Sequence, residues 1–282
     1  MTIREKGYSG WDGELRRGRG RWLPIFRQGI RSVFRKKYAK LVFALCSSTF
    51  VVFLAAIYIA TKPELKMMAE LVRMFSSDAA IFNTFYTNGF HFWMLIILSL
   101  FSGAELIADD LKFKSFSLYF ARPLRKVDYL LGKLSIVYFY LLLFTLAPGV
   151  LLVLAKIIFA GSFSLQPRLL AGILLFPLLA ALTMSLLALA VSSLSTSSKL
   201  TRVFIFLVYM FGNSLAEILK HVFGSDWFYL FSLQKTVEQL GVFFFGSKTG
   251  WAYPPWVAAA EMLLLSALFA FILMRRVRIA EA

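Results

Sequence analysis

The chain has 282 residues, of which 59% are hydrophobic and 17% aromatic, and it carries 31 Lys and Arg residues against 15 Asp and Glu residues. A mean hydropathy of +0.72 excludes a single soluble domain, because too few polar residues would remain to cover its surface. The formal net charge of +16 is equally foreign to a protein wholly buried in lipid. Both facts fit if apolar and basic residues occupy different segments, as they do in a polytopic membrane protein.

The rare residue types exclude two further classes of protein. The single cysteine, Cys46, cannot form a disulfide framework or a cysteine-based metal cluster within one chain. The two histidines, His91 and His221, are too few for a histidine-rich site. We therefore predict no metal site. We also predict no catalytic residues, because motifs such as H-E-x-x-H and G-x-S-x-G are absent from the sequence.

The N-terminal part divides into a basic tail and an amphipathic helix. Residues 1–20 contain five glycines and few apolar side chains, which predicts a disordered cytoplasmic tail. Residues 21–38 predict a helix with one apolar and one basic face. The apolar face comprises Trp22, Phe26, Ile30 and Val33, and the basic face comprises Arg27, Arg31 and Arg35.

Such a helix, placed immediately before a span, is expected to lie along the inner leaflet in contact with anionic lipids. Simple topogenic charge would explain the arginines but not the apolar face. A position beside the membrane also explains the basic residues of the tail without nucleic-acid binding.

Six apolar runs follow within residues 39–282, each close to the roughly 20 residues that a bilayer core requires. They are 41–61, 91–108, 134–159, 169–194, 203–222 and 256–274. Soluble proteins also contain buried apolar helices, but six such runs in one chain favour membrane spans. We therefore predict an all-α polytopic membrane protein with six transmembrane helices.

The Lys and Arg residues are distributed very unevenly between the connecting segments. Segments 1–40, 109–133, 195–202 and 275–282 together hold 23 of them, whereas the alternate connections hold 6. The positive-inside rule then places both termini in the cytoplasm, which agrees with an even number of crossings.

The connection between the fifth and sixth spans differs from the other outer connections. Residues 223–255 are rich in Trp, Tyr and Phe and are broken by several glycines. This stretch is too aromatic for a free aqueous loop and too broken for a span. Because Trp and Tyr favour the headgroup level, we predict a re-entrant or interfacial hairpin at the outer leaflet.

The cytoplasmic connection 109–133 combines charged residues with apolar side chains of the kind that are usually buried. Asp109 and Asp110 mark the exit of the second span, and Arg122-Pro123 ends a short element, since a residue before proline is pushed out of helical geometry. A compact, partly apolar element on this face is suited to docking on a soluble partner. An ordinary solvated basic loop would explain the charges but not the aromatic residues.

In this segment the chain resembles the permease subunits of type-2 exporter-like ABC transporters. The residues that carry the resemblance are Gly103, Asp109, Leu118, Arg122, Pro123, Leu124, Tyr129, Gly132 and Lys133. The specific motif covers about thirty residues. The predicted six spans, the surface helix and the serine-rich connection between spans four and five agree with the family along most of the chain. The sequence departs from the family in 112–120, which is more aromatic than the corresponding run in relatives.

The resemblance implies that residues 109–133 form a coupling element seated on a separate ATPase subunit. The residues that it assigns to this contact are Asp109, Asp110, Phe116, Leu118, Tyr119, Phe120, Arg122, Pro123, Arg125 and Lys126. It further implies two permease chains, identical or related, that enclose a translocation path, and two copies of the ATPase. Such complexes lie in the plasma (inner) membrane of prokaryotes. Because the chain contains no phosphate-binding loop, ATP and Mg²⁺ are expected on the partner, and the chain itself is expected to be neither an enzyme nor a cofactor carrier.

Three glutamates within or beside the spans are candidates for function, because a carboxylate in hydrocarbon costs about 2.5–3.5 kcal/mol. Glu105 is expected to pair with a nearby Lys or Arg at the inner interface. Glu217 and Glu261 are expected in the outer half of the bilayer, where they would line the translocation path or pair with Lys220 or Lys156. Snorkelling carboxylates at the interface would explain them equally well.

Two functions of different classes remain. The first is the permease subunit of an ATP-driven exporter, for an amphipathic compound more than for a bare ion, which would need several oxygen ligands. The second is a non-transporting membrane regulator or assembly scaffold that docks an ATPase. An intramembrane enzyme is disfavoured by the missing catalytic pairs.

Overall fold

The computed structural model describes residues 20–62, 77–116, 119, 124–161, 166–246 and 251–279. This part of the chain is helical and contains no strand, which confirms the all-α prediction. Six helical segments are long and apolar enough to cross a membrane, as predicted. They are Lys40–Thr61, Gly89–Lys112, Lys126–Ala160, Pro167–Leu194, Ser198–Phe223 and Pro255–Val277.

The first two elements, α1 (Leu23–Arg35) and α2 (Lys37–Cys46), are joined at Lys36. The first span consists of α2 and α3 (Ser48–Thr61), separated by a turn at Ser47. The hydroxyl of Ser47 donates a hydrogen bond to the carbonyl of Phe43 (2.9 Å). The sequence did not predict this break, because the apolar run passes through it uninterrupted.

The helix α5 (Asp78–Thr87) precedes the second span, α6 (Gly89–Lys112). Ser77 caps α5, since its hydroxyl accepts a hydrogen bond from the backbone N–H of Ala80 (3.2 Å). Asp78 forms an ion pair with Lys156, which ties α5 to the end of the third span. The sequence did not predict α5, and residues 63–76 lie outside the described part of the chain.

The third span, α8 (Lys126–Ala160), begins at Lys126 rather than at the predicted residue 134. The reason is a cap: the backbone N–H of Arg125 donates a hydrogen bond to the carboxylate of Asp128 (3.4 Å). Residues 126–133, which include the charged residues Lys126, Asp128 and Lys133, therefore belong to the first turns of the spanning helix. Part of the predicted coupling element is thus continuous with a span.

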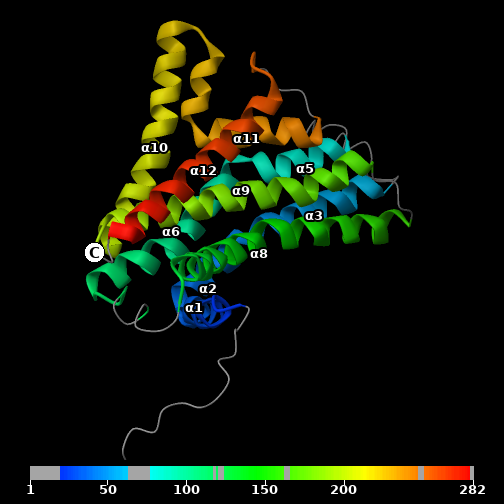
Figure 1. Ribbon diagram of the computed structural model, residues 1–282. Helices are drawn as coiled ribbons and strands as arrows, with labels where there is room; N and C mark the ends of the chain where they lie inside the picture. Colours follow the sequence, from blue (N-terminus) through cyan, green and yellow to red (C-terminus); the bar gives the residue numbers. More distant parts are fainter. Residues whose placement is uncertain are drawn as a thin grey trace, which may run out of the picture.

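The fourth span, α9 (Pro167–Leu194), is the centre of the bundle. Of the most apolar stretch of α9, 72% is buried inside the bundle, against 17% for the fifth span, α10 (Ser198–Phe223). It contacts α6, α8 and the sixth span, α12 (Pro255–Ile279). Figure 1 shows α3, α6, α8 and α9 running side by side, while α10 diverges from them.

The closest contact between α6 and α9 is made by small residues. A methyl group at Gly103 would lie only 2.8 Å from the Cβ of Ala188, so glycine is required for this approach. One turn further along α9, the hydroxyl of Ser192 donates to the carbonyl of Ala104 (2.9 Å) and accepts from the backbone N–H groups of Ile107 and Ala108 (3.2 and 3.0 Å). A side chain of α9 therefore serves as a hydrogen-bond partner for the backbone of α6.

The amphipathic helix α1 packs on the start of α8. Phe26 meets Phe139 edge to face with ring centroids 5.6 Å apart, and Val33 is buried. Ile30 also packs against the core, whereas Arg27, Arg31 and Arg35 are exposed. The two-faced helix is thus confirmed, but its apolar face contacts the protein itself. Contact of the arginines with lipid remains a prediction.

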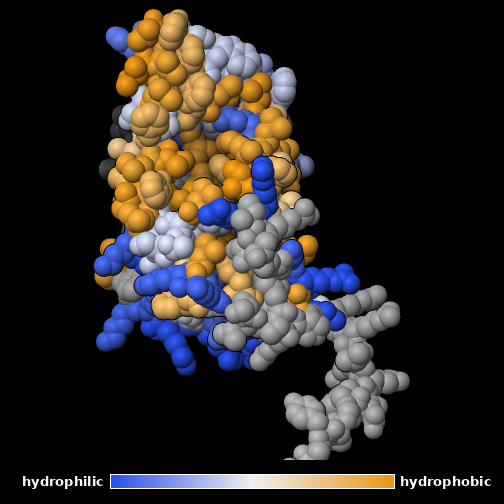
Figure 2. Space-filling view, turned by 60° about the vertical axis from the view of Figure 1, so that its left-hand side comes forward, coloured by the Kyte–Doolittle hydropathy of each residue, from blue (hydrophilic) through white to orange (hydrophobic). Residues whose placement is uncertain are grey.

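The connection between the fifth and sixth spans forms two short helices, η3 (Asp226–Phe231) and α11 (Leu233–Phe245). Apolar side chains of α11 are buried where it packs against α5, α9 and α12. The carbonyl of Phe231 lies against Gly212, so η3 folds back on α10. In Figure 2 the surface is largely hydrophobic in its upper part, and hydrophilic side chains gather at the lower end, where α1 and α2 lie in Figure 1.

Candidate functional site

The inner end of α6 carries a carboxylate that links three segments of the chain. Glu105 forms ion pairs with Lys36, at the α1–α2 junction, and with Arg202, in the first turns of α10. Its side chain is 22% exposed. The prediction that Glu105 pairs with a Lys or Arg is confirmed. Its partners lie 69 and 97 residues away in sequence, so one carboxylate holds the first and fifth spans against the second.

A second polar contact joins the end of α6 to the start of α8. Asp110 forms an ion pair with Lys133 (N–O 2.7 Å) and accepts a hydrogen bond from the hydroxyl of Tyr129 (2.6 Å). Lys133 is buried, and its ammonium group also donates to the carbonyl of Leu106 (2.8 Å). Paired charges of this kind resist separation, because breaking one leaves a buried charge uncompensated.

The aromatic residues after α6 pack on the same tyrosine. The chain leaves α6 through Lys114, which has a positive φ of 51°, and turns back toward α8. Phe116 is 5% exposed, and its ring centroid lies 5.4 Å from that of Tyr129. The ring centroid of Tyr119 lies 5.2 Å from that of Tyr129. Burial, and next the charge of Asp110, raise the pKa of Tyr119.

The residues predicted for ATPase contact are therefore in different environments. Phe116 and Tyr119 contact the chain's own α8, and Asp110 is held by two partners. Arg125 is exposed. Phe113, which directly follows α6, is 69% exposed, and it is the large apolar side chain most available to a partner among the described residues of this segment. Lys126 begins α8. Four further predicted residues lie outside the described part of the chain, namely Leu118, Phe120, Arg122 and Pro123.

A cleft of about 200 Å³ separates α1 from α6 beside these contacts. Its polar lining is formed by Ser32, Lys36, Glu105, Asp109, Asp110 and Lys133. Among the described residues, Asp109 has no ion-pair partner. Within the same part of the chain no three His, Cys, Asp or Glu side chains are placed to hold a metal ion.

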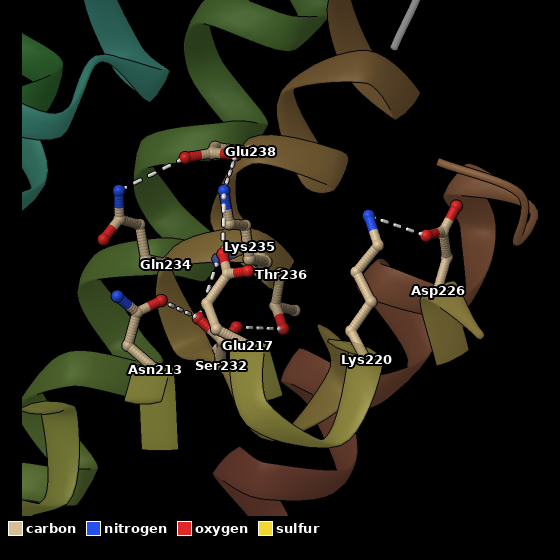
Figure 3. Close-up of polar contacts among 9 residues, drawn as sticks. All are labelled: Asn213, Glu217, Lys220, Asp226, Ser232, Gln234, Lys235, Thr236 and Glu238. Atoms are coloured by element: carbon tan, nitrogen blue, oxygen red, sulfur yellow. Dashed lines mark hydrogen bonds and ion pairs between the residues drawn. The ribbon is translucent and has the colours of Figure 1, made fainter. Parts of the chain in front are cut away.

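A second polar cluster lies at the opposite ends of the spans, between α10, η3, α11 and α12 (Figure 3). Lys235 of α11 lies 3.8 Å from Glu217 of α10 and 3.5 Å from Glu238 (N–O distances). Lys220 forms an ion pair with Asp226 of η3 (3.1 Å). The Lys220 hydrogen bond is also the main reason why the pKa of Asp226 lies below its ordinary value.

Glu261 of α12 reaches the same region. Its two oxygens lie 3.2 and 3.1 Å from the hydroxyl of Thr236 in α11, whose single hydrogen they share as acceptors with the carbonyl of Ser232 (3.0 Å). Of the two alternatives expected for Glu217 and Glu261, pairing with Lys220 or Lys156 is not seen among the described residues, where those lysines pair with Asp226 and Asp78. A position lining the translocation path remains a prediction. The structure nevertheless brings both glutamates to α11, where Glu217 lies near Lys235 and Glu261 lies near Thr236.

Sequence reasoning missed the partners more often than the carboxylates. Lys36 and Arg202 were counted as topogenic charge, and Lys235 as one of the few outer cations, so nothing singled them out. Ser192 gave no signal at all, since serines in a span are common. A scan against protein-family models finds no match to this chain, and a search of the curated proteins finds none either.

Proposed function

We propose that the chain is the membrane-spanning permease subunit of an ATP-driven ABC transporter that exports its substrate. In this proposal two permease chains enclose the translocation path, and separate cytoplasmic ATPase subunits bind ATP and Mg²⁺. The observation that supports it best is the continuous set of contacts from the segment after α6 to the ends of the spans. A solvated loop would not need these contacts with the spans.

The contacts suggest how a push from the ATPase would reach the membrane part. Phe116 and Tyr119 would pass it to Tyr129, and the Asp110–Lys133 pair would pass it to α6 and α8 together. Phe116, Tyr129 and Lys133 are buried, and packed interiors transmit displacement because they have little free volume.

Glu105 would extend this movement to the other spans. It lies on α6 one turn before Asp109 and holds Lys36 and Arg202. A shift of α6 would therefore carry the start of α10 and the α1–α2 junction with it. Since α10 is the least buried span, it is the one most free to change its angle to the bundle.

The charge distribution supports the orientation that this mechanism requires. In this proposal α1, the end of α6 and both termini lie on the cytoplasmic side, as the positive-inside rule predicts from the Lys- and Arg-rich segments. The membrane would be a prokaryotic inner membrane, as the resemblance implies. The exposed arginines of α1 would then lie beside anionic headgroups. The helices η3 and α11 would lie as a re-entrant or interfacial hairpin at the outer leaflet.

Purification of the tagged chain from its native membrane tests the proposal. We expect a nucleotide-binding ATPase subunit to co-purify in a fixed ratio, identified by mass spectrometry. A chain that is repeatedly isolated alone, under conditions that preserve membrane complexes, would contradict the proposal. An ATPase that co-purifies but whose hydrolysis never responds to any change in this chain would favour the scaffold.

A paired substitution locates the contact. Combining Leu118→Ala with Arg122→Glu should lower the ATPase activity that depends on the membrane part by about tenfold, because hot-spot contacts are typically worth more than 1 kcal/mol. Lys62→Glu is the matched control, since it reverses an exposed charge at the far end of α3. Equal effects of the two changes would mean that the docking site lies elsewhere.

A further inference from the structure

The outer polar cluster has a net negative charge in a chain that is otherwise strongly basic. Its charged members are Glu217, Lys220, Asp226, Lys235 and Glu238, and Glu261 lies beside them. Three carboxylates thus face two ammonium groups, whereas the whole chain carries +16. In the part of the chain that the structure describes, no Lys or Arg lies within ion-pair distance of Glu261.

Two aromatic rings in this cluster are already arranged around cations. Tyr229 and Trp251 meet edge to face with centroids 4.3 Å apart. The ammonium group of Lys220 lies 4.5 Å from the Tyr229 centroid and 5.3 Å from that of Trp251. The ammonium group of Lys235 lies 4.9 Å from Trp251 and 5.5 Å from Tyr229. All four distances fall in the range of cation–π attraction, so this ring pair contacts two cations at once.

Lys235 occupies its position loosely. Its distances of 3.5 and 3.8 Å to Glu238 and Glu217 exceed the 2.7–2.9 Å of a charge-assisted hydrogen bond. The site is partly accessible, because the side chain of Lys235 is 18% exposed and that of Glu217 is 50% exposed. A competing cation could therefore replace this ammonium group without breaking a close ion pair.

A buried hydroxyl in the same cluster also lacks a partner. Tyr253 is 1% exposed, and its oxygen has no hydrogen-bond partner among the described residues. Its ring lies 5.8 Å from that of Trp227. Burial and then the charge of Glu261 raise the pKa of Tyr253, so this hydroxyl keeps its proton. Unpartnered buried polar groups are uncommon, and a water, an ion or a ligand can satisfy them.

We propose that the cluster between α10, η3, α11 and α12 binds an organic cation, held by Trp251 and Tyr229 and by the carboxylates of Glu217 and Glu238. The cation takes the position that the Lys235 ammonium group fills in the unliganded chain. A quaternary ammonium or phosphonium group fits best, because ring faces and carboxylates bind it without needing N–H donors. An anion is disfavoured, because carboxylates outnumber ammonium groups in the cluster. A bare metal ion is disfavoured, since no three ligating side chains converge in the described part of the chain.

The inference deepens the proposed function. The idea that this cation is transported rests on that function. Binding itself requires neither ATP nor an ATPase. It can therefore be measured on the purified chain, and its failure is distinguishable from failure of the co-purification experiment.

The test compares two probes of the same shape and opposite charge, tetraphenylphosphonium and tetraphenylborate, by isothermal titration calorimetry of the full chain in a neutral detergent. We expect saturable binding of the phosphonium ion only. Trp251→Leu should weaken it about tenfold, as loss of a desolvated cation–π contact does. Trp256→Leu is the matched control, because Trp256 is 60% exposed on α12, and it should change the affinity less than twofold.

Two further variants keep the test decisive if the loss of Trp251 disturbs folding. Glu217→Gln is isosteric and half exposed, and it should weaken phosphonium binding about threefold to tenfold. Lys235→Met removes the internal competitor and should tighten binding about tenfold. The proposal is overturned if both probes bind alike, if neither binds saturably, or if Lys235→Met weakens binding.

Discussion

Substitution of Gly149 by alanine tests how the third span, α8, packs against the buried ring of Tyr86 in α5. A methyl group at this position would overlap the hydroxyl oxygen of Tyr86, which is fully buried. That hydroxyl donates long hydrogen bonds to the carbonyls of Thr145 and Ile173 (3.5 and 3.3 Å). The ring stacks on Phe245 at 5.6 Å and cannot retreat freely. Gly149→Ala should therefore strain the core.

The expected cost follows from two opposing terms. Overpacking a well-filled core costs roughly 1–3 kcal/mol, whereas replacing glycine by alanine within a helix gains about 1 kcal/mol. Because the overlap at Tyr86 is severe, we expect a net loss of about 1–2 kcal/mol in the free energy of unfolding. Tyr86→Phe alone should cost about 0.5–1 kcal/mol, since it removes only long hydrogen bonds.

The double variant gives the decisive number. In the Tyr86→Phe background the hydroxyl is gone, and only the ring carbon at 2.9 Å from the new methyl remains close. The cost of Gly149→Ala should then fall to about zero, giving a coupling energy of about 1–2 kcal/mol. Reversible unfolding in mixed micelles measures each variant, with Gly89→Ala as a control at an uncrowded glycine. An equal cost of Gly149→Ala in both backgrounds would refute the packing argument.

Three other changes probe the polar contacts. Glu105→Gln should lower the free energy of unfolding by about 1–2 kcal/mol, between the values for exposed and buried pairs, and should reduce ATPase-linked conformational signals if the proposed coupling is right. Ser192→Ala should cost about 1–2 kcal/mol in the same unfolding assay, whereas Ser193→Ala, whose hydroxyl bonds only within its own helix, should cost less. The pKa of Asp226 is lowered in the folded chain, so its contribution to stability is present above the ordinary pKa of 3.8 and is lost as the pH falls through the lower folded pKa. Melting curves should show a loss of stability as the pH falls below about 4, and Asp226→Asn should reduce that loss.

The sequence was sufficient for the features that depend on local composition. The six spans follow from apolar runs, and the two faces of α1 follow from the spacing of Phe26, Ile30 and Arg27. The pairing of Glu105 followed from the cost of an isolated carboxylate near lipid. Each of these inferences needed only neighbouring residues and the properties of the bilayer.

The rest depends on contacts between distant segments. The partners Lys36 and Arg202 are chosen by how α2 and α10 pack against α6, which no local pattern encodes. The same holds for Glu217, which meets Lys235 of α11 rather than Lys220 of its own helix. Phe116 illustrates a different limit: its aromatic character indicated a buried surface, but not that the chain itself would bury it.

The contact of α1 with α8 has a consequence for the order of events during synthesis. Phe26 leaves the ribosome about 110 residues before Phe139, its partner in the folded chain. At about 5–20 residues per second, α1 exists for roughly 6–20 s before its docking surface has been made. We therefore expect the nascent helix to adhere to the membrane surface first and to transfer to α8 afterwards, which would make it an early anchor that is later incorporated into the bundle.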